Sequence, residues 1–209
     1  MLASQYQKAI DKIMGNSSSS SLPALQTVAS CDTSRFMGTW FVIAVKPTVF
    51  ETKSSNCVEK YTFLDSGKTS HDIDIDFTYN EEAPLTSKIK ALPQKGYVQG
   101  DKYNSAVWKV SPMWPIKLDY SVIELGNDYE YCVIGYPNRN YCWIMGRHPV
   151  MAESTFKSLT KKLVEKHQYP ADANGGVEGL RMVEQKWTRA ECEKRGLTTK
   201  DVPDDMLSK

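Results

Sequence analysis

The chain has 209 residues, of which 41% are hydrophobic and 24% charged, a length that suits one domain with tails rather than two full cores. Lysine and arginine number 26 against 25 acidic residues. The chain therefore has no strong net charge to hold a phosphate backbone, and we expect no nucleic-acid partner. No apolar stretch approaches the roughly 20 residues that a membrane-spanning helix needs.

Three regions follow one another along the chain. Residues 1–30 join a short helix-compatible piece to the serine-rich stretch 17–21 and predict a flexible N-terminal arm. Residues 31–186 alternate apolar runs with turn residues and predict the folded domain. Residues 187–209 are rich in Lys, Glu and Asp and predict a polar C-terminal tail. The amino terminus shows no apolar segment of the kind that a secretory signal contains.

Period-two alternation of apolar and polar residues is clearest at 71–77. Ile73, Ile75 and Phe77 fall on one face of this segment and aspartates on the other, which predicts a half-buried strand. Alternate carboxylates on one strand usually form a solvated outer face, and no His/Cys cluster of ligand spacing accompanies them. We therefore expect no metal ion.

Turn residues recur between runs rich in Val, Ile, Tyr, Phe and Trp, as in chains of short antiparallel strands. Eight such strands in up-and-down order can close into a barrel, which removes exposed edges and leaves room for one small ligand. The expected strands lie near 39–46, 57–64, 70–79, 96–103, 105–111, 118–125, 129–136 and 141–147.

The period changes to that of a helix after the eighth strand. Phe156, Leu159 and Leu163 recur at helical spacing within 152–166. Glu153 lies near the start of this segment and lysines near its end, an order of charges that interacts favourably with the helix dipole. One amphipathic helix would cover the outside of the barrel. A last short strand is expected within 180–185.

Two short motifs carry a family resemblance: Gly38-Thr39-Trp40 at the start of the first strand and Trp143-Ile144-Met145-Gly146-Arg147 in the last barrel strand. With the intervening run 119–142 they resemble the lipocalin family, in the branch of bacterial outer-membrane lipocalins, plant temperature-induced lipocalins and apolipoprotein D. The resemblance implies an all-β fold, an eight-stranded antiparallel up-and-down barrel with one C-terminal α-helix packed outside. It also implies that Gly38, Trp40 and Arg147 are structural, with Trp40 closing the barrel floor and Arg147 stacking across it.

Four loops fall at the same rim of such a barrel and form its open mouth. They span 47–56, 80–95, 111–117 and 137–140. They carry Phe50, Trp114 and other apolar residues beyond what solubility favours. These side chains either fold back to cap the barrel or form a ligand gate that also touches a membrane surface, where tryptophan and lysine suit the interface.

The residues expected to line the ligand site follow from strand alternation, from the family positions and, for Phe50 and Trp114, from the mouth loops that carry them. They are Phe50, Ile73, Ile75, Phe77, Trp108, Trp114, Tyr120 and Val122. A mostly apolar lining with a few hydroxyls favours a fatty acid, lysolipid, sterol, retinoid or carotenoid and does not choose among them. Each inward assignment depends on the strand register, because a slip of one residue turns a side chain to the other face.

The five cysteines bear on the compartment. The resemblance implies a disulfide between Cys57, at the start of the second strand, and Cys192, in the C-terminal tail. Such a bridge indicates an oxidising space, so we expect an extracytoplasmic or membrane-associated protein. Cys132 and Cys142 fall on opposite faces of a hairpin, which predicts no bridge between them; together with Cys31 they are expected to be buried thiols.

The expected function is to bind and carry or scavenge a small hydrophobic ligand, with peripheral membrane contact at the mouth, no cofactor and no catalytic residue. The alternative is a lipocalin-fold enzyme, of isomerase or de-epoxidase type, acting on a lipid or carotenoid. An inward thiol at Cys132 or Cys142, or an inward carboxylate at Asp119 or Glu124, could support that chemistry if its pKa were perturbed. A barrel filled by aromatic side chains would instead indicate a scaffold for protein interactions.

Overall fold

The computed structural model describes residues 22–46, 53–172 and 177–208. Its strands form a single antiparallel sheet that closes on itself, which confirms the predicted all-β barrel. The strands are β1 (Gly38–Lys46), β2 (Ser55–Phe63), β3 (Ile73–Asn80), β4 (Ile89–Val98), β5 (Val107–Ser111), β6 (Leu118–Leu125), β7 (Tyr131–Gly135), β8 (Cys142–Gly146) and β9 (Arg181–Met182). The helical elements are α2 (Thr33–Phe36), α3 (Glu153–Glu165), α4 (Arg189–Lys194) and the short 3-10 turns η1 (Val177–Gly179) and η2 (Asp204–Met206).

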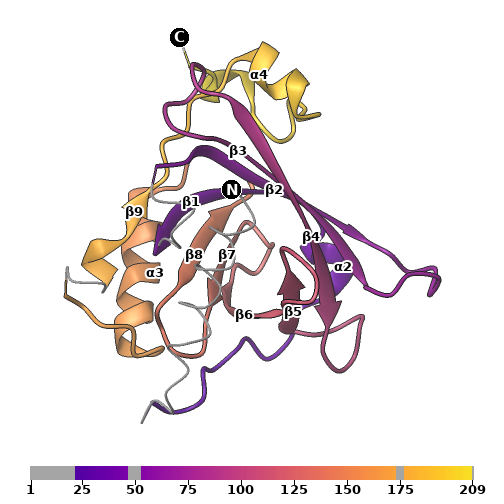
Figure 1. The fold of residues 1–209 in the computed structure, drawn as a ribbon. Coiled ribbons are helices and arrows are strands. Elements are labelled where there is room, and N and C mark those ends of the chain that lie inside the picture. Colours follow the sequence, from indigo (N-terminus) through magenta and orange to yellow (C-terminus); the bar gives the residue numbers. More distant parts are fainter. Residues whose placement is uncertain (1–21, 47–52, 173–176, 209) are drawn as a thin grey trace.

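Strand β1 closes the barrel because it pairs with both of the strands that would otherwise be edges. Its first half, from Gly38 to Phe41, pairs with β2, and from Phe41 onward it pairs with β8. An irregularity between Val42 and Ala44 bends β1 where it leaves β2. The short β9 adds to the same strand at Ala44, so that the strands surround one interior (Figure 1).

Strand β4 corrects two predictions from the sequence. The expected strand at 96–103 begins seven residues earlier, at Ile89, and the expected long mouth loop at 80–95 is reduced to 81–88. The segment contains Pro93 and Gly96 and few β-branched residues, so it lacks the usual sequence pattern of a strand. Eight consecutive pairings with β3, from Ile73 to Asn80, hold β4 in place. Its side chains alternate between exposed and half-buried along most of its length.

Helix α3 covers the outer face of β6, β7 and β8, as the helical periodicity predicts. Its Leu159 and Leu163 are fully buried in a cluster with Ile123, Val133 and Ile144 from these strands. Burying side chains of this size stabilises the fold by about 1.5–3 kcal/mol each. The predicted last strand is shorter than expected, since β9 contains two residues.

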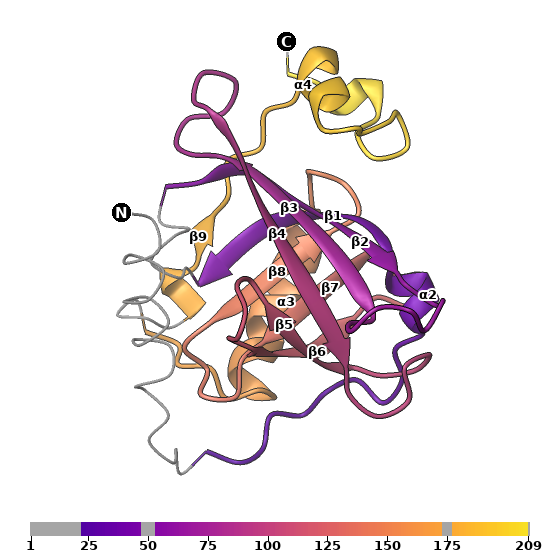
Figure 2. The same cartoon turned by 45° about the vertical axis from the view of Figure 1, so that its right-hand side comes forward.

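The C-terminal segment packs on the barrel although its composition is polar. Trp187 lies edge-on to Phe41 at 5.5 Å between ring centroids, and Cys192, Leu197 and Val202 are buried beside them. Both ribbon views place α4 next to the turn between β3 and β4 (Figures 1 and 2). Four apolar side chains spaced along this segment are thus enough to bind it to the outer wall.

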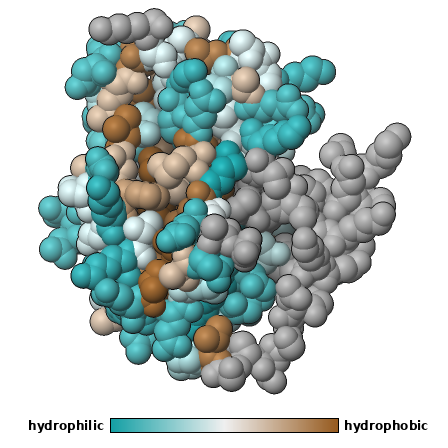
Figure 3. Space-filling view, turned by 90° about the vertical axis from the view of Figure 1, so that its left-hand side faces the viewer, coloured by the Kyte–Doolittle hydropathy of each residue, from teal (hydrophilic) through white to brown (hydrophobic). Residues whose placement is uncertain are grey.

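Apolar residues are also visible from outside, on the face that carries β9 and α3 (Figure 3). Met182 of β9 is 55% exposed and Val150, just before α3, is 63% exposed. None of the helices in the described residues is long and apolar enough to span a membrane.

Candidate ligand-binding site

The closed end of the barrel is formed by α2 and by the ring of Trp40. Asp32 caps α2 by accepting a hydrogen bond from the Arg35 backbone N–H, and this short turn carries the fully buried Phe36 across the barrel axis. Phe36 lies 5.0 Å from both Trp40 and Trp108, measured between ring centroids. These three rings form a solid floor.

Arg147 joins this floor to the strands around it. Its guanidinium carbon lies 3.8 Å from the centre of the Trp40 ring, a stacking geometry worth about 0.5–2 kcal/mol. Its five N–H groups donate to five backbone carbonyls. The acceptors are the oxygens of Arg35, Phe36, Met37, Thr39 and Tyr129. Gly38 fits beneath it with a φ of 94°, and an added Cβ would come within 3.4 Å of Arg147 Nη1.

Above the floor, a hydrogen-bonded group of polar side chains lies inside the barrel. The Tyr120 ring stacks on Trp108, with 5.2 Å between centroids and 4° between planes. Its hydroxyl lies 2.8 Å from the hydroxyl of Tyr61, which donates to Oε2 of Glu59. Burial, reinforced by the nearby Glu59 carboxylate, raises the pKa of both phenols well above the usual range. Both therefore keep their protons at neutral pH.

Inward-facing aromatic side chains are fully buried at the floor and less buried near the rim, whereas Val45 and Cys57 near the rim stay buried. At the floor Phe36, Trp40 and Trp108 have no exposed surface. Nearer the rim, Tyr79 and Trp143 pack against the same interior cluster but are only half-buried. The aromatic side chains near the rim are therefore less completely covered than those at the floor.

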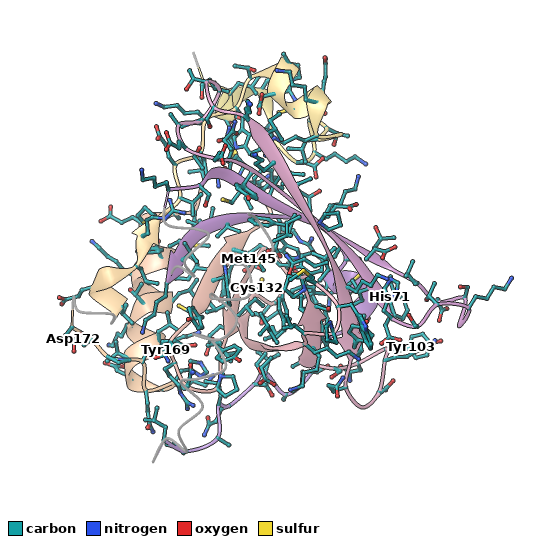
Figure 4. All side chains as sticks on the ribbon, in the orientation of Figure 1. His71, Tyr103, Cys132, Met145, Tyr169 and Asp172 are labelled. Carbon is teal, nitrogen blue, oxygen red and sulfur yellow. The ribbon has the colours of Figure 1, made fainter. Side chains whose placement is uncertain are left out.

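Six of the predicted ligand-site residues share this interior cluster. They are Ile73, Ile75, Phe77, Trp108, Tyr120 and Val122. Figure 4 labels two residues of the same region, Cys132 on β7 and Met145 on β8, which pair with each other in the middle of the barrel. Trp114 lies apart from them in the mouth loop between β5 and β6, with 76% of its surface exposed. Phe50 lies outside the described residues.

Sequence reasoning missed Glu59 and Tyr61. The alternation along β2 could have found them, because Cys57, Glu59 and Tyr61 are separated by two residues and share the inward face. The intervening Val58 packs in the outer cluster with Trp187. Glu59 is charged, and a charged residue in a strand gives no hydrophobic signal of an inward position. The segment therefore stands out in the sequence only by Cys57.

The expected disulfide between Cys57 and Cys192 is absent from the structure, which contains thiols at all five cysteines. Cys57 belongs to the interior cluster, and Cys192 packs on the outside of the wall with Val58. Because successive residues of a strand point to opposite faces, the wall itself separates the two sulfur atoms. Cys132 and Cys142 likewise lie on the inner and outer faces, as predicted.

The groups considered for catalysis do not gather inside the barrel. Asp119 pairs with Lys109 at 2.6 Å, on the opposite face of β6 from Tyr120. An irregularity in β6 between Val122 and Glu124 turns the Glu124 carboxylate outward, against α3. Burial raises the pKa of Cys132, which keeps this inward thiol protonated.

Glu124 instead fastens α3 to the barrel. Its oxygens accept from Lys162 at 2.9 Å, Lys166 at 2.7 Å and His167 at 2.9 Å. Burial alone would raise the pKa of this carboxyl group, but the three donors outweigh it and lower the pKa to about 2. Burial lowers the pKa of His167 despite the neighbouring carboxylate.

A closed antiparallel up-and-down barrel with a solid floor and one helix packed outside is the architecture of the lipocalin class of β-barrels. The family comparison agrees: residues 31–173 match the model of the lipocalin-like domain. The chain belongs to the lipocalin family.

Relatives in this family include plant and bacterial proteins. The chain is 27% identical to temperature-induced lipocalin-1 of Arabidopsis thaliana over 154 residues, which cover 68% of this chain and 76% of the relative. It is 30% identical to the outer membrane lipoprotein Blc of Citrobacter freundii over 126 residues, which cover 60% of this chain and 67% of the relative. These matches confirm the resemblance seen in the sequence.

Solved structures support the fold at lower sequence identity. Insecticyanin from the tobacco hornworm Manduca sexta aligns with a TM-score of 0.55 and 16% identity, covering 81% of this chain and 88% of that structure. Apocrustacyanin C1 aligns with a TM-score of 0.53 and 11% identity, covering 83% of this chain and 99% of that structure. At such identities the likeness concerns the barrel alone.

Proposed function

We propose that this protein binds one small hydrophobic molecule inside the barrel and carries or scavenges it. The observation that supports the proposal is the difference in exposure between the fully buried Trp40 and Trp108 at the floor and the half-buried Tyr79 and Trp143 near the rim. Ile73, Ile75, Phe77 and Val122 give the interior an apolar wall. The named residues sit where an apolar ligand entering from the mouth would contact them.

Desolvation of the ligand supplies the driving force. Burying about 300 Å² of apolar ligand surface yields roughly 7 kcal/mol at about 25 cal/mol per Å², before the loss of translational and rotational freedom is subtracted. Micromolar binding follows from such a balance. Ile75 and Phe77 lie two residues apart on the same face of β3 and would contact the ligand at neighbouring points along its length.

Native mass spectrometry of the protein purified from its own source tests this function. Organic extraction and identification of the released molecule should give a lipid or pigment in a one-to-one ratio with the protein. A protein that carries nothing, and that ignores a panel of lipids, retinoids and carotenoids, would contradict it. Thermal melting of the same sample shows that the barrel is folded when binding is measured.

We further propose that the mouth contacts a membrane surface in an extracytoplasmic compartment. The supporting observation is Trp114, which is 76% exposed in the mouth loop between β5 and β6; Leu85, 40% exposed, lies in the loop between β3 and β4 at the same end of the strands. Exposed tryptophan favours the interface between headgroups and acyl chains. The bacterial relatives are named as outer membrane lipoproteins.

Vesicle sedimentation tests this contact. Trp114→Ala should reduce the fraction of protein bound to vesicles that contain anionic phospholipid. Tyr103→Ala is the matched control, since Tyr103 is an aromatic residue, 50% exposed, in the loop between β4 and β5 at the closed end. Equal loss of binding in both variants would contradict a role for the mouth.

A further inference from the structure

The C-terminal segment places a buried arginine against the mouth end of the barrel. Arg195 directly follows α4, and only 2% of its side chain is exposed. A guanidinium group is rarely buried unless its N–H groups find acceptors. Helix α4 lies next to the turn between β3 and β4 (Figures 1 and 2), so this cation reaches the rim of the barrel from outside the wall.

Two neighbouring strands supply acceptors for Arg195. Its Nη1 donates to the Asn56 carbonyl near the start of β2 at 2.9 Å, and its Nη2 donates to Asn80 Oδ1 at the end of β3 at 2.5 Å. Nη2 also donates to Glu191 Oε1 at 2.9 Å, within α4. Because Asn56 and Asn80 are both buried, these hydrogen bonds are shielded from water. One side chain thus holds the mouth ends of β2 and β3.

Asn80 passes this constraint on to the loop between β3 and β4, residues 81–88. While its Oδ1 accepts from Arg195, its Nδ2 donates to the Ser87 carbonyl at 2.9 Å. An amide has distinct donor and acceptor ends, so Arg195 also determines which end faces the loop. The Ser87 hydroxyl in turn accepts from the Glu82 N–H at 3.1 Å. The conformation of the loop therefore depends on a residue outside it.

The same anchor lies beside the inner wall. Asn80 follows Tyr79, whose ring packs against the interior cluster near the rim. Since adjacent residues of a strand point to opposite faces, a bond to Asn80 on the outer face fixes the backbone that carries the Tyr79 ring. The loop 81–88 comes next, and it is covered at Pro84, which is buried between exposed neighbours. A displacement of Asn80 would move both the inward ring and the loop.

We propose that Arg195 is a positioning residue for ligand exchange: from outside the barrel it fixes Asn80, and through Asn80 it sets the rate at which an apolar ligand passes the mouth. This inference rests on the proposed function and adds to it a control of entry and exit. Arg195 lies on the outer face of the wall, so it acts on the rates and not on the contacts of the bound ligand. Loss of Arg195 frees the loop 81–88 to open, and entry and exit both become faster.

Stopped-flow fluorescence with the uncharged apolar probe N-phenylnaphthylamine tests the proposal on the full chain. In Arg195→Met the association and dissociation rate constants should both rise about fivefold, while Kd stays within about twofold of that of the unaltered protein. Arg189→Met is the matched control, because Arg189 belongs to the same helix but donates to Val202 and Asp204 of the C-terminal segment. Its loss should leave both rates unchanged, and equal changes in the two variants would overturn the proposal.

A second variant interrupts the path at its middle. Asn80→Ala leaves the ion pair between Arg195 and Glu191 in place and should reproduce the parallel rise of both rate constants. Hydrogen exchange adds a measurement that needs no ligand. The amides of Glu82 and Ser87 should exchange about tenfold faster in both variants, with the amides of β7 and β8 unchanged. Loop amides that keep their exchange rates would show that Arg195 does not position the loop.

The outcomes separate this inference from the function on which it rests. A folded variant that binds the probe with unchanged rates supports a carrier and overturns the role of Arg195. A faster dissociation alone, with a weaker Kd, also overturns it, because the binding contacts themselves would then depend on Arg195. An unaltered protein that does not bind the probe overturns both the function and the inference. If Arg195→Met does not fold, Asn80→Ala decides.

Discussion

At the closed end of the barrel the rings of Phe36, Trp40 and Trp108 are fully buried, and both indole N–H groups donate to backbone carbonyls. At the open end Trp143 reaches solvent and Trp114 is 76% exposed. The same type of side chain therefore does different work at the two ends. Burial and satisfied hydrogen bonds make the closed end the source of stability, and the open end is left available for contact with other molecules.

Substitution of the floor tryptophan should break the closed end. Trp40→Ala removes a fully buried ring and the platform for Arg147, and we expect a loss of about 3–5 kcal/mol in the free energy of unfolding. Urea denaturation followed by circular dichroism measures it. An unchanged midpoint would show that Trp40 does not support the floor.

Arginine 147 offers a more conservative test of the same end. Arg147→Lys keeps the charge but loses the planar group that stacks on Trp40 and reaches five carbonyls. We expect a loss of about 2–3 kcal/mol, because buried carbonyl oxygens are left without donors. The measurement is the shift in thermal midpoint relative to Arg35→Lys, whose guanidinium stacks on Tyr129 at the surface. Equal shifts would contradict a special role for Arg147.

Acid should weaken the outer wall independently of both ends. The folded-state pKa of Glu124 is about 2, below its ordinary value of 4.5, so the unfolded chain binds more protons as the pH falls between these values. The stabilisation is fully present above about 4.5 and is lost as the pH falls toward 2. His167, whose pKa is lowered from 6.5, adds a loss that begins as the pH falls below that value.

The partners Lys162 and Lys166 are nearly half-exposed, and solvent screening reduces the Glu124 contribution to about 1–2 kcal/mol. Glu124→Gln should flatten the acid side of the curve of unfolding free energy against pH. Glu153→Gln, which alters an exposed pair with Lys157 on the same helix, is the matched control. A curve that keeps its shape in Glu124→Gln would rule out this carboxylate as the source.

The smallest effect on stability is expected at the mouth. Trp114→Ala removes a side chain that is mostly in water, so the free energy of unfolding should change by less than about 0.5 kcal/mol. Binding to vesicles or to the ligand should weaken. The changes in unfolding free energy of Trp40→Ala and Trp114→Ala thus measure how the closed and open ends differ in their contribution to stability. A large loss of stability in Trp114→Ala would contradict this difference.

The sequence predicted those parts of the fold that depend on local pattern. The barrel could be predicted from the alternation at Ile73, Ile75 and Phe77 and from the motifs around Trp40 and Arg147. β4 was misplaced because it is held by its pairing with β3 rather than by its own residues. Cross-strand pairing is a property of two segments, and one segment read alone does not reveal it.

The candidate site was predicted less completely than the fold, for a similar reason. Apolar lining residues such as Val122 could be inferred because hydrophobicity and strand period act together. The inward position of Glu59 could not, since a charged residue in a strand usually marks the solvent side. Its hydrogen bond with Tyr61, and that of Tyr61 with Tyr120, 59 residues further along the sequence, form only in the folded barrel. The turn of Glu124 away from the interior depends likewise on an irregularity in β6.

Strand β4 lies in a part of the barrel wall that the two outer apolar clusters do not cover. Leu92 and Gln94 are half-buried on its inner side, Pro93 and Lys95 are exposed on its outer side, and no residue of β4 belongs to the two outer clusters of the described chain. Its outer side thus faces water, while its inner side chains are only half-buried. Local opening of the sheet should therefore occur first at β4. Its amide hydrogens should exchange with deuterium sooner than those of β7 and β8 beneath α3. A bound molecule in contact with Leu92 would slow this exchange. The exchange rate of β4 would therefore report whether the barrel holds a ligand.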